Sequence, residues 1–333
     1  MNKFVELPLV EPLYQTYHYQ GPTSATIANN PSIRNWLLNE AVNLTCKRKF
    51  LSGFTTPLVT IKDSSWVHNP CFEKYWLSLR FTKGYMHPII RGMLDKGYYV
   101  SFTRVDDFYI PGKTWYKEHH FAHDGLICGY NQSDKTYCVY AYDKNWIYQK
   151  FWTPQKAFDK GCAAMMHLEE APGISAIKPK LDQITFSPET ACERIIEYLD
   201  SSIEKYPMDG DGDIFGIVVH AYIAEYVAKL HAGSIPYERM DRRVFRLIWE
   251  HKKAMLERMQ AMEKTLNIEN QYSEKYKTVV AESNYMRMLY ASHHMKRRDS
   301  VLPIIRKKLF DLTEIEEMIL TEFTSEVRKD LGV

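Results

Sequence analysis

Residues 109–143 read YIPGKTWYKEHHFAHDGLICGYNQSDKTYCVYAYD, and this stretch predicts a β-hairpin. Its middle part, Gly125–Tyr130, is a short apolar run with strand character. Turn-forming residues follow at 131–135, and Thr136–Tyr142 returns as a second strand rich in aromatic side chains. The sheet that contains this hairpin is therefore expected to be the centre of the fold.

His123 stands at the start of the first strand of this hairpin, and Asp143 ends the second. In an antiparallel pair with so short a turn, the start of one strand lies beside the end of the other, so the two residues are predicted to be neighbours. A carboxylate beside an imidazole fixes its tautomer and stabilises its protonated form. The pair is thus a candidate general base with its orienting group, although two ordinary surface residues at the ends of a hairpin would show the same spacing.

A family resemblance adds to this pattern. A histidine that leads a strand, then Gly129-Tyr130-Asn131, a turn, a second strand and a terminal aspartate resembles the His–Asp half of papain-like cysteine-protease folds. The stretch is most similar to the double-glycine leader peptidases and to the family of the N-terminal domain of the butirosin biosynthesis acyltransferase, found in nonribosomal peptide and related natural-product clusters. The resemblance extends through 105–111 and weakly to 241–252. It implies an α+β, papain-like fold with an antiparallel sheet.

The nucleophile of papain-like enzymes sits at the start of a helix, where the related peptidases read Cys-Gly-Pro. This chain has Gln20-Gly21-Pro22 at that point, so an amide stands where the resemblance expects a thiol. Ser24, one turn later, is the candidate nucleophile, and its alternative role is that of a first-turn helix serine. By the same resemblance Gln15, one residue off the family's spacing, is a candidate oxyanion donor, and Gln20 a candidate substrate contact.

Further candidates come from the segment before the hairpin. Residues 98–105 predict a strand that ends at Asp106 and Asp107, and both carboxylates first suggest loop caps. The resemblance makes Asp106 a substrate contact and adds Tyr109 and Tyr116 to the substrate-binding residues.

The cysteines and histidines do not form a recognisable metal site. Six cysteines, at 46, 71, 128, 138, 162 and 192, lack CxxC spacing, so neither a zinc site nor a disulfide framework is predicted. Cys46 precedes three cations and Cys71 precedes a helix predicted over 72–82, which makes both fallback nucleophiles, although most cysteines are buried and inert. The HHxxH pattern at 119–123 precedes a strand and has no clear further ligand, so no metal is expected.

Composition places the chain among ordinary globular proteins. Of its 333 residues 45% are hydrophobic and 25% charged, and the net charge of +2 gives no reason to expect nucleic acid or a membrane surface as partner. No apolar run approaches the length of a membrane span, and the N-terminus lacks a signal-peptide pattern, so a cytoplasmic location is expected. Beyond residue 180 the hydrophobic period changes from 2 to 3.6, which predicts an α+β domain over 1–180 and an all-helical bundle over 181–333.

Together with the resemblance, the sequence predicts an enzyme that forms an amide bond by acyl or peptidyl transfer. The resemblance implies that the donor is a thioester on the phosphopantetheine of an acyl or peptidyl carrier protein and that the acceptor is a small amine. No other cofactor is expected. A second copy of the chain, in a homodimer, is a further candidate partner. His123 would activate a side-chain nucleophile near Ser24 that forms an acyl-enzyme, or it would deprotonate the amine directly. A non-catalytic scaffold that binds a carrier protein or partner enzyme is the alternative, and a leader peptidase is a third.

Overall fold

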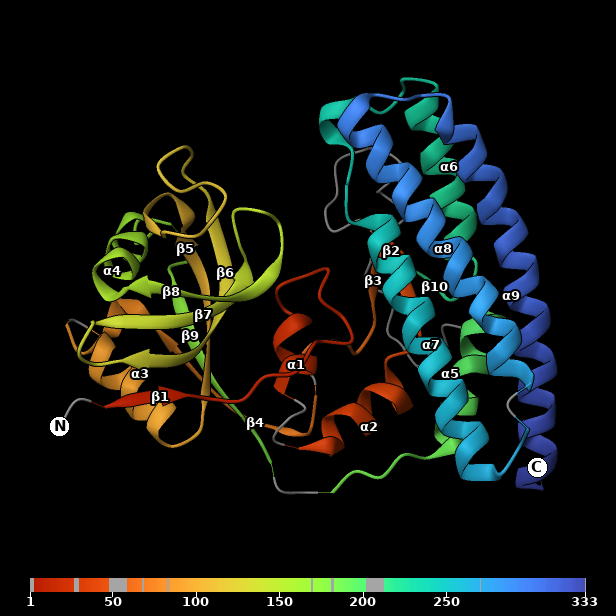
Figure 1. The fold of residues 1–333 in the computed structure, drawn as a ribbon, viewed down its shortest axis with the longest axis horizontal. Coiled ribbons are helices and arrows are strands. Elements are labelled where there is room, and N and C mark those ends of the chain that lie inside the picture. Colours follow the sequence, from red (N-terminus) through yellow and green to blue (C-terminus); the bar gives the residue numbers. More distant parts are fainter. Residues whose placement is uncertain are drawn as a thin grey trace. The chain divides into compact units, whose positions relative to one another are not determined.

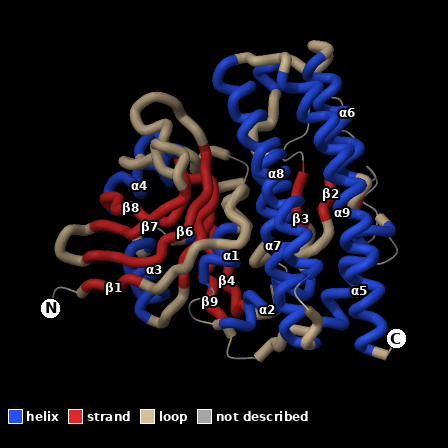
Figure 2. Tube along the Cα trace, turned by 45° about the vertical axis from the view of Figure 1, so that its right-hand side comes forward, coloured by secondary structure: helices blue, strands red, loops and turns tan. Residues whose placement is uncertain are grey.

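The computed structural model describes residues 3–26, 30–47, 59–67, 69–82, 84–168, 170–180, 183–201, 213–269 and 271–332. The chain divides into two compact units: unit 1 comprises Met1–Ile33 and Ser65–Gln183, and unit 2 comprises Arg34–Ser64 and Ile184–Val333. Residues 34–64 thus belong with the helical part of the chain, whereas the sequence placed them in the first domain. Most strands lie in unit 1 and the long helices in unit 2, so the fold class is mixed α+β (Figure 1, Figure 2).

Unit 1 is built on a seven-stranded sheet in the order β4-β9-β5-β6-β7-β8, with β1 paired to β6. Every strand pair described in this sheet is antiparallel. The elements are β1 (Phe4–Glu6), α1 (Gly21–Ala25), β4 (Phe72–Ser78), α3 (Met86–Asp95), β5 (Tyr99–Asp106), β6 (Ala122–Asn131), β7 (Thr136–Tyr142), β8 (Tyr148–Pro154), α4 (Gln155–Ala164) and β9 (Gly173–Pro179), with short 3-10 turns η3 (Leu79–Phe81) and η4 (Asp107–Tyr109).

The predicted hairpin is confirmed as β6 and β7, which pair from Leu126↔Tyr140 to Asn131↔Thr136. The helix predicted over 72–82 is wrong, because residues 72–78 form the strand β4 along the edge of the sheet. β4 pairs over its whole length with β9, which lies between β4 and β5 in the sheet and which was not predicted as a strand from the sequence. The aromatic residues Tyr75 and Trp76 suit a pleated edge better than a helix.

One face of the sheet packs against α3 and α4. In α3, Met86, Ile90 and Leu94 recur every four residues and so line one side of the helix. They join Phe158 of α4 and Phe102 of β5 in a single hydrophobic cluster. This packing fixes the end of β5, from which the residues of the candidate site continue.

Unit 2 contains a three-stranded sheet in the order β10-β2-β3 and a set of long helices. Because β10 (Asp213–Phe215) lies within 181–333, the prediction that this range is all-helical is wrong at that strand. Among the residues described, no helix has both the length and the apolarity of a membrane span. The elements are α2 (Pro31–Glu40, most of which belongs to this unit), β2 (Leu44–Lys47), β3 (Val59–Ile61), α5 (Pro188–Asp200), β10 (Asp213–Phe215), α6 (Val219–His231), η5 (Tyr237–Arg239), α7 (Val244–Leu266), α8 (Gln271–Lys296) and α9 (Val301–Leu331).

A fully buried ionic network lies inside unit 2. The Lys252 ammonium on α7 donates to Glu316 Oε2 on α9 at 2.7 Å and to the Tyr198 hydroxyl on α5 at 2.9 Å. It also lies 3.2 Å from Nε2 of His220 on α6 and 3.2 Å from Nδ1 of His251. A charge removed from water is tolerated only with partners of this kind, so the network fixes how four helices meet.

From this buried network we expect the free energy of unfolding of unit 2 to fall at acid pH. Each imidazole turns one nitrogen toward the Lys252 ammonium at 3.2 Å, while its other nitrogen lies 3.0 Å from Thr313 Oγ1 in His220 and 2.7 Å from the Val42 carbonyl oxygen in His251. Burial, and then the Lys252 cation, lowers the pKa of His220 and of His251 well below the usual value. The unfolded chain therefore binds more protons below about pH 6.5, and stability that is present above that pH is lost as the pH falls.

We expect the free energy of unfolding to fall by up to about 1.4 kcal/mol per pH unit for each imidazole below about pH 6.5. Urea unfolding of the whole chain at pH 7.5, 6.5 and 5.5, followed by circular dichroism, measures this slope. Substitution of the exposed His231 by Gln leaves the slope unchanged and serves as the control. A free energy of unfolding that stays constant down to pH 5.5 would contradict the expectation.

Candidate functional site

The candidate site is centred on His123, which stands near the start of β6, opposite Val105 at the end of β5. Its Nδ1 lies 2.7 Å from Oδ2 of Asp107, in the 3-10 turn that follows β5. An ionised carboxylate only accepts hydrogen bonds, so the proton of this bond belongs to Nδ1, and Nε2 carries the lone pair of the neutral ring. The Asp107 side chain is 3% exposed and the His123 side chain 21% exposed, so the imidazole reaches solvent and its carboxylate does not.

A buried lysine completes the arrangement. Lys113 Nζ lies 3.4 Å from Asp107 Oδ1 and 3.5 Å from His123 Nδ1, and its side chain is 1% exposed. Burial lowers the pKa of Lys113 below its usual value, and the Asp107 carboxylate acts in the opposite direction. The Lys113 cation compensates the buried charge of Asp107. One oxygen of the Asp107 carboxylate therefore faces His123 and the other faces the Lys113 ammonium.

The sequence Ile110-Pro111-Gly112-Lys113 explains how this lysine enters the site. The amide of Lys113 donates to the carbonyl of Ile110 at 3.2 Å, which closes a four-residue turn. Proline in the second position and glycine in the third, here with φ of +95°, are the residues that a type II turn requires. The turn reverses the chain after η4 and directs Lys113 back toward Asp107.

A second imidazole contacts the first. The His18 and His123 rings lie 4.1 Å apart between centroids and are inclined at 76°, so the edge of one ring meets the face of the other. His18 also contacts Tyr142 edge-on at 5.5 Å, and Phe121 lies 5.1 Å from His123. Residue 18 comes just before α1, so unit 1 brings together a histidine from its first segment and a histidine from its central strand.

Asp143, the orienting group predicted for His123, has a different role. Its Oδ1 accepts hydrogen bonds from the amides of Asn145 at 2.8 Å and Ile147 at 2.9 Å, and its Oδ2 accepts from Gln149 Nε2 at 2.7 Å. Burial acts to raise the pKa of Asp143, but these hydrogen bonds outweigh it and lower the pKa below the usual value. The carboxylate that orients His123 is that of Asp107, because Asp143 is turned into the connection between β7 and β8.

Asp106 forms a second histidine–aspartate pair beside the first. Its Oδ2 lies 2.7 Å from His120 Nδ1, and its Oδ1 accepts from the amides of Phe108 at 3.1 Å and Phe121 at 3.0 Å. The Asp106 side chain is 0% exposed, whereas that of His120 is 59% exposed. The predicted substrate contact is thus a buried carboxylate that holds the loop before β6, and the part of this pair that faces solvent is His120.

The two predicted tyrosines lie on the same loop. Tyr109 contacts the Phe108 ring at 5.1 Å and the His120 ring at 6.0 Å. The Lys117 ammonium lies 5.1 Å from the centroid of the Tyr116 ring. Among the described His, Cys, Asp and Glu side chains, no group of three or more is placed to hold a metal ion, and the histidines at 120 and 123 face different aspartates.

The predicted nucleophile region is α1 and the segment before it. Gln20 is fully buried, and its main-chain N–H donates to the main-chain carbonyl of Tyr17 at 3.0 Å. Gly21 packs so closely on Tyr148 that a Cβ at this position would overlap the phenol ring. The Gln15 main-chain oxygen accepts from the Tyr142 hydroxyl at 2.7 Å, so this segment is tied to the end of β7. The side chain of Ser24 lies outside the part of the chain that the structure describes.

The fallback cysteine nucleophiles are in unsuitable surroundings. All six cysteines of the chain are free thiols and buried. Burial raises the pKa of Cys46, the opposite of what a thiolate nucleophile needs. Cys71 precedes a strand rather than a helix, and its thiol points to the carbonyl of Ser32 at 3.6 Å. Neither residue therefore has the features of an activated thiol.

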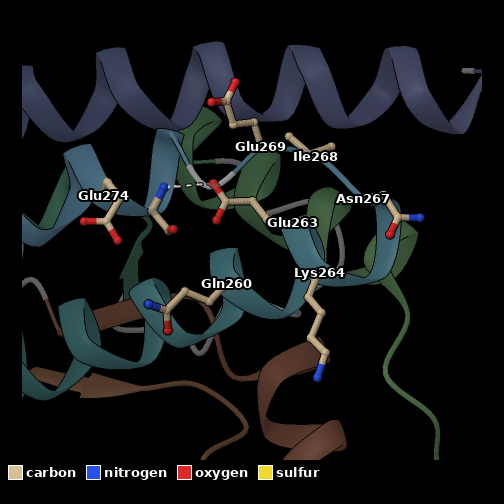
Figure 3. Close-up of a pocket in the computed structure, with 8 residues that line it drawn as sticks. Gln260, Glu263, Lys264, Asn267, Ile268, Glu269 and Glu274 are labelled. Atoms are coloured by element: carbon tan, nitrogen blue, oxygen red, sulfur yellow. Dashed lines mark hydrogen bonds between the residues drawn. The ribbon is translucent and has the colours of Figure 1, made fainter.

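A hollow of about 650 Å³ lies in unit 2, where α7 ends and α8 begins (Figure 3). Glu263 Oε1 accepts a hydrogen bond from the amide of Ser273 at 2.9 Å, so this buried carboxylate caps the first turn of α8. The residues that line the hollow are Gln260, Glu263, Lys264, Asn267, Ile268, Glu269, Ser273 and Glu274. None of these lining residues is a histidine or a cysteine, so the hollow is a weaker candidate than the His123 site.

Sequence reasoning missed Asp107 as the orienting group, and it missed Lys113 and His18 altogether. The Pro-Gly turn before Lys113 was a usable signal for the lysine, whereas His18 gave none. Comparison with protein-family models and with curated proteins found no match, so the site rests on its own geometry.

Proposed function

We propose that the protein transfers an acyl or peptidyl group from a thioester to an amine, with His123 as general base and Asp107 as its orienting group. The observation that carries the proposal is the 2.7 Å contact between His123 Nδ1 and the buried Asp107 carboxylate. It leaves Nε2 of a partly exposed imidazole as the proton acceptor, which is the arrangement that general-base catalysis needs.

In the reaction that we propose, His123 Nε2 accepts a proton from the amine while the amine nitrogen attacks the thioester carbonyl. The tetrahedral intermediate then collapses with breakage of the carbon–sulfur bond. The leaving thiolate takes the proton back from His123, so the products are an amide and a thiol. Asp107 stabilises the protonated imidazole during these steps, and Lys113 compensates the charge of Asp107.

This route requires no nucleophile on the protein. It is supported by the burial of all six cysteines and by Gln20 at the position where the family resemblance expects a thiol. A route through an acyl-enzyme on Ser24 is the remaining variant of the same function.

The resemblance supplies the rest of the proposal. The donor is an acyl or peptidyl group on the phosphopantetheine of a carrier protein, in the synthesis of a natural product of nonribosomal-peptide type, and the acceptor is a small amine. Unit 1 would then be a papain-like fold. The order of its elements supports this, with an extended first segment, a short helix at Gly21 and an antiparallel sheet that carries the histidine.

The test uses acyl-pantetheine thioesters and small diamines, with the amide product and the intact protein mass measured by mass spectrometry. We expect amide from the wild type, a rate about 10²- to 10⁴-fold lower for His123→Ala, and no covalent adduct on the protein. Substitution of the exposed His119 by Ala leaves the rate unchanged and is the matched control. An adduct that disappears in Ser24→Ala would instead establish the acyl-enzyme. Amide formation that His123→Ala does not slow would contradict the proposal.

The alternative is a non-catalytic scaffold that binds a carrier protein or partner enzyme. The buried Gln20, at the position of the expected nucleophile, is the observation that favours it. A scaffold gives no amide with any donor, and its binding to a carrier protein is the same in the wild type and in His123→Ala.

A further inference from the structure

The imidazole of His18 has a position that the general-base mechanism does not explain. Its ring centroid lies 4.1 Å from that of His123, at an inclination of 76°. Two tyrosines flank it, Tyr142 at 5.5 Å and Tyr148 at 6.0 Å, and the Tyr142 hydroxyl is bonded to the main chain at Gln15. His18 is thus held beside the catalytic imidazole by contacts on more than one side.

The proposed chemistry requires a second polar group at this location. When the amine attacks, negative charge develops on the carbonyl oxygen of the donor, about one bond length from the carbon being attacked. A hydrogen-bond donor aimed at that oxygen contributes more to the rate than most other single interactions in acyl transfer. The group must lie close to the base, because base and donor act on the same acyl group.

We propose that His18 is a further catalytic residue, which donates a hydrogen bond to the carbonyl oxygen of the acyl donor as that oxygen becomes negative. This inference rests on the proposed function. His18 neither gains nor loses a proton over the cycle: its N–H bonds the oxyanion of the tetrahedral intermediate, and it releases the oxygen when the carbonyl forms again. Neutral imidazole carries one N–H and can fill this role.

The other candidates for the role fit less well. For Gln15, which the family resemblance suggested, the hydrogen bond from the Tyr142 hydroxyl is to the main-chain oxygen, and this contact does not place the side-chain amide beside His123. His120 has an exposed imidazole, but it belongs to the separate pair with Asp106 and stacks on Phe108 at 4.3 Å. The His18 ring, by contrast, contacts the His123 ring directly, with 4.1 Å between the ring centroids.

The test compares His18→Leu, which cannot donate a hydrogen bond, with His18→Gln, whose side-chain amide can. Amide formation from acyl-pantetheine is measured as kcat and KM, and the thermal unfolding midpoint of each variant shows that it is folded. We expect His18→Leu to lower kcat by about 10²- to 10³-fold, with KM for the thioester changed less than about threefold. His18→Gln should retain at least about tenfold more of kcat than His18→Leu. His119→Leu is the matched control, because this exposed imidazole belongs to neither histidine–aspartate pair, and it keeps kcat within about threefold.

The outcomes separate this inference from the function on which it rests. Equal loss in His18→Leu and His18→Gln, a loss confined to KM, or a loss in kcat below about tenfold would overturn the role of His18 while amide formation by the wild type still stood. Absence of amide from the wild type with every donor would overturn the proposed function and this inference with it.

Discussion

Asp107→Asn is expected to lower the rate of amide formation by about 10³- to 10⁴-fold, although the substitution changes one atom. The reason lies in Lys113, whose ammonium is 3.4 Å from Oδ1 of Asp107. An asparagine at 107 turns its carbonyl oxygen toward this cation and its NH₂ group toward Nδ1 of His123. The imidazole must then accept at Nδ1 and carry its proton on Nε2, which removes the base.

The control for this prediction is Asp143→Asn. Asp143 bonds the connection between β7 and β8, so its substitution should leave the rate within about threefold and lower the free energy of unfolding by about 1 to 2 kcal/mol, because hydrogen bonds to a charged acceptor weaken. In the double variant Asp107→Asn/Lys113→Met the asparagine is free to rotate, and part of the rate returns. A large loss of rate in Asp143→Asn and none in Asp107→Asn would show that the two aspartates have been assigned the wrong way round.

Lys252→Met is expected to lower the free energy of unfolding by about 3 to 5 kcal/mol. The substitution removes the cation that donates to Glu316 Oε2 at 2.7 Å and leaves a carboxylate of 0% exposure without its counter-charge. Burial lowers the pKa of Lys252, and Glu316 opposes that effect, so each charge depends on the other to remain buried. Urea unfolding followed by circular dichroism measures the loss.

A surface ion pair of the same length provides the control. Lys308 Nζ lies 2.7 Å from Glu282 Oε2, but these side chains are 30% and 42% exposed. Lys308→Met should therefore cost no more than about 1 kcal/mol. The double variant Lys252→Met/Glu316→Gln should recover much of the loss, since it no longer buries an unpaired charge. If the two lysine variants lost the same amount of stability, the network would not have the role assigned to it.

Sequence reasoning predicted the local features of the fold well. The β6–β7 hairpin, the strand β5 before it and the long helices after residue 188 all follow from periodicity and turn residues within one stretch of chain. It failed at β4 and β9, which pair with each other across about 100 residues. An edge strand and its distant partner show no signal that a window of a dozen residues can detect.

In the candidate site too, local sequence predicted some features, and the others depend on pairing between distant strands. The hairpin register explains why His123 and Asp143 were expected to be neighbours, but register fixes backbone positions and not the direction of a side chain at a strand end. The amides at Asn145 and Ile147 draw the Asp143 carboxylate away. Asp107 reaches His123 only because β5 pairs with β6 on the other side of the hairpin, and that pairing is not local.

The most direct measurement is the tautomer of His123, read from ¹⁵N–¹H correlation spectra of the imidazole ring in the wild-type protein at pH 8. It needs neither a substrate nor a partner. We predict a proton on Nδ1, in the hydrogen bond to Asp107, and an unprotonated Nε2; in Asp107→Asn the proton moves to Nε2. A wild-type His123 that carries its proton on Nε2 would contradict the account, because such a ring has no lone pair with which to act as the base.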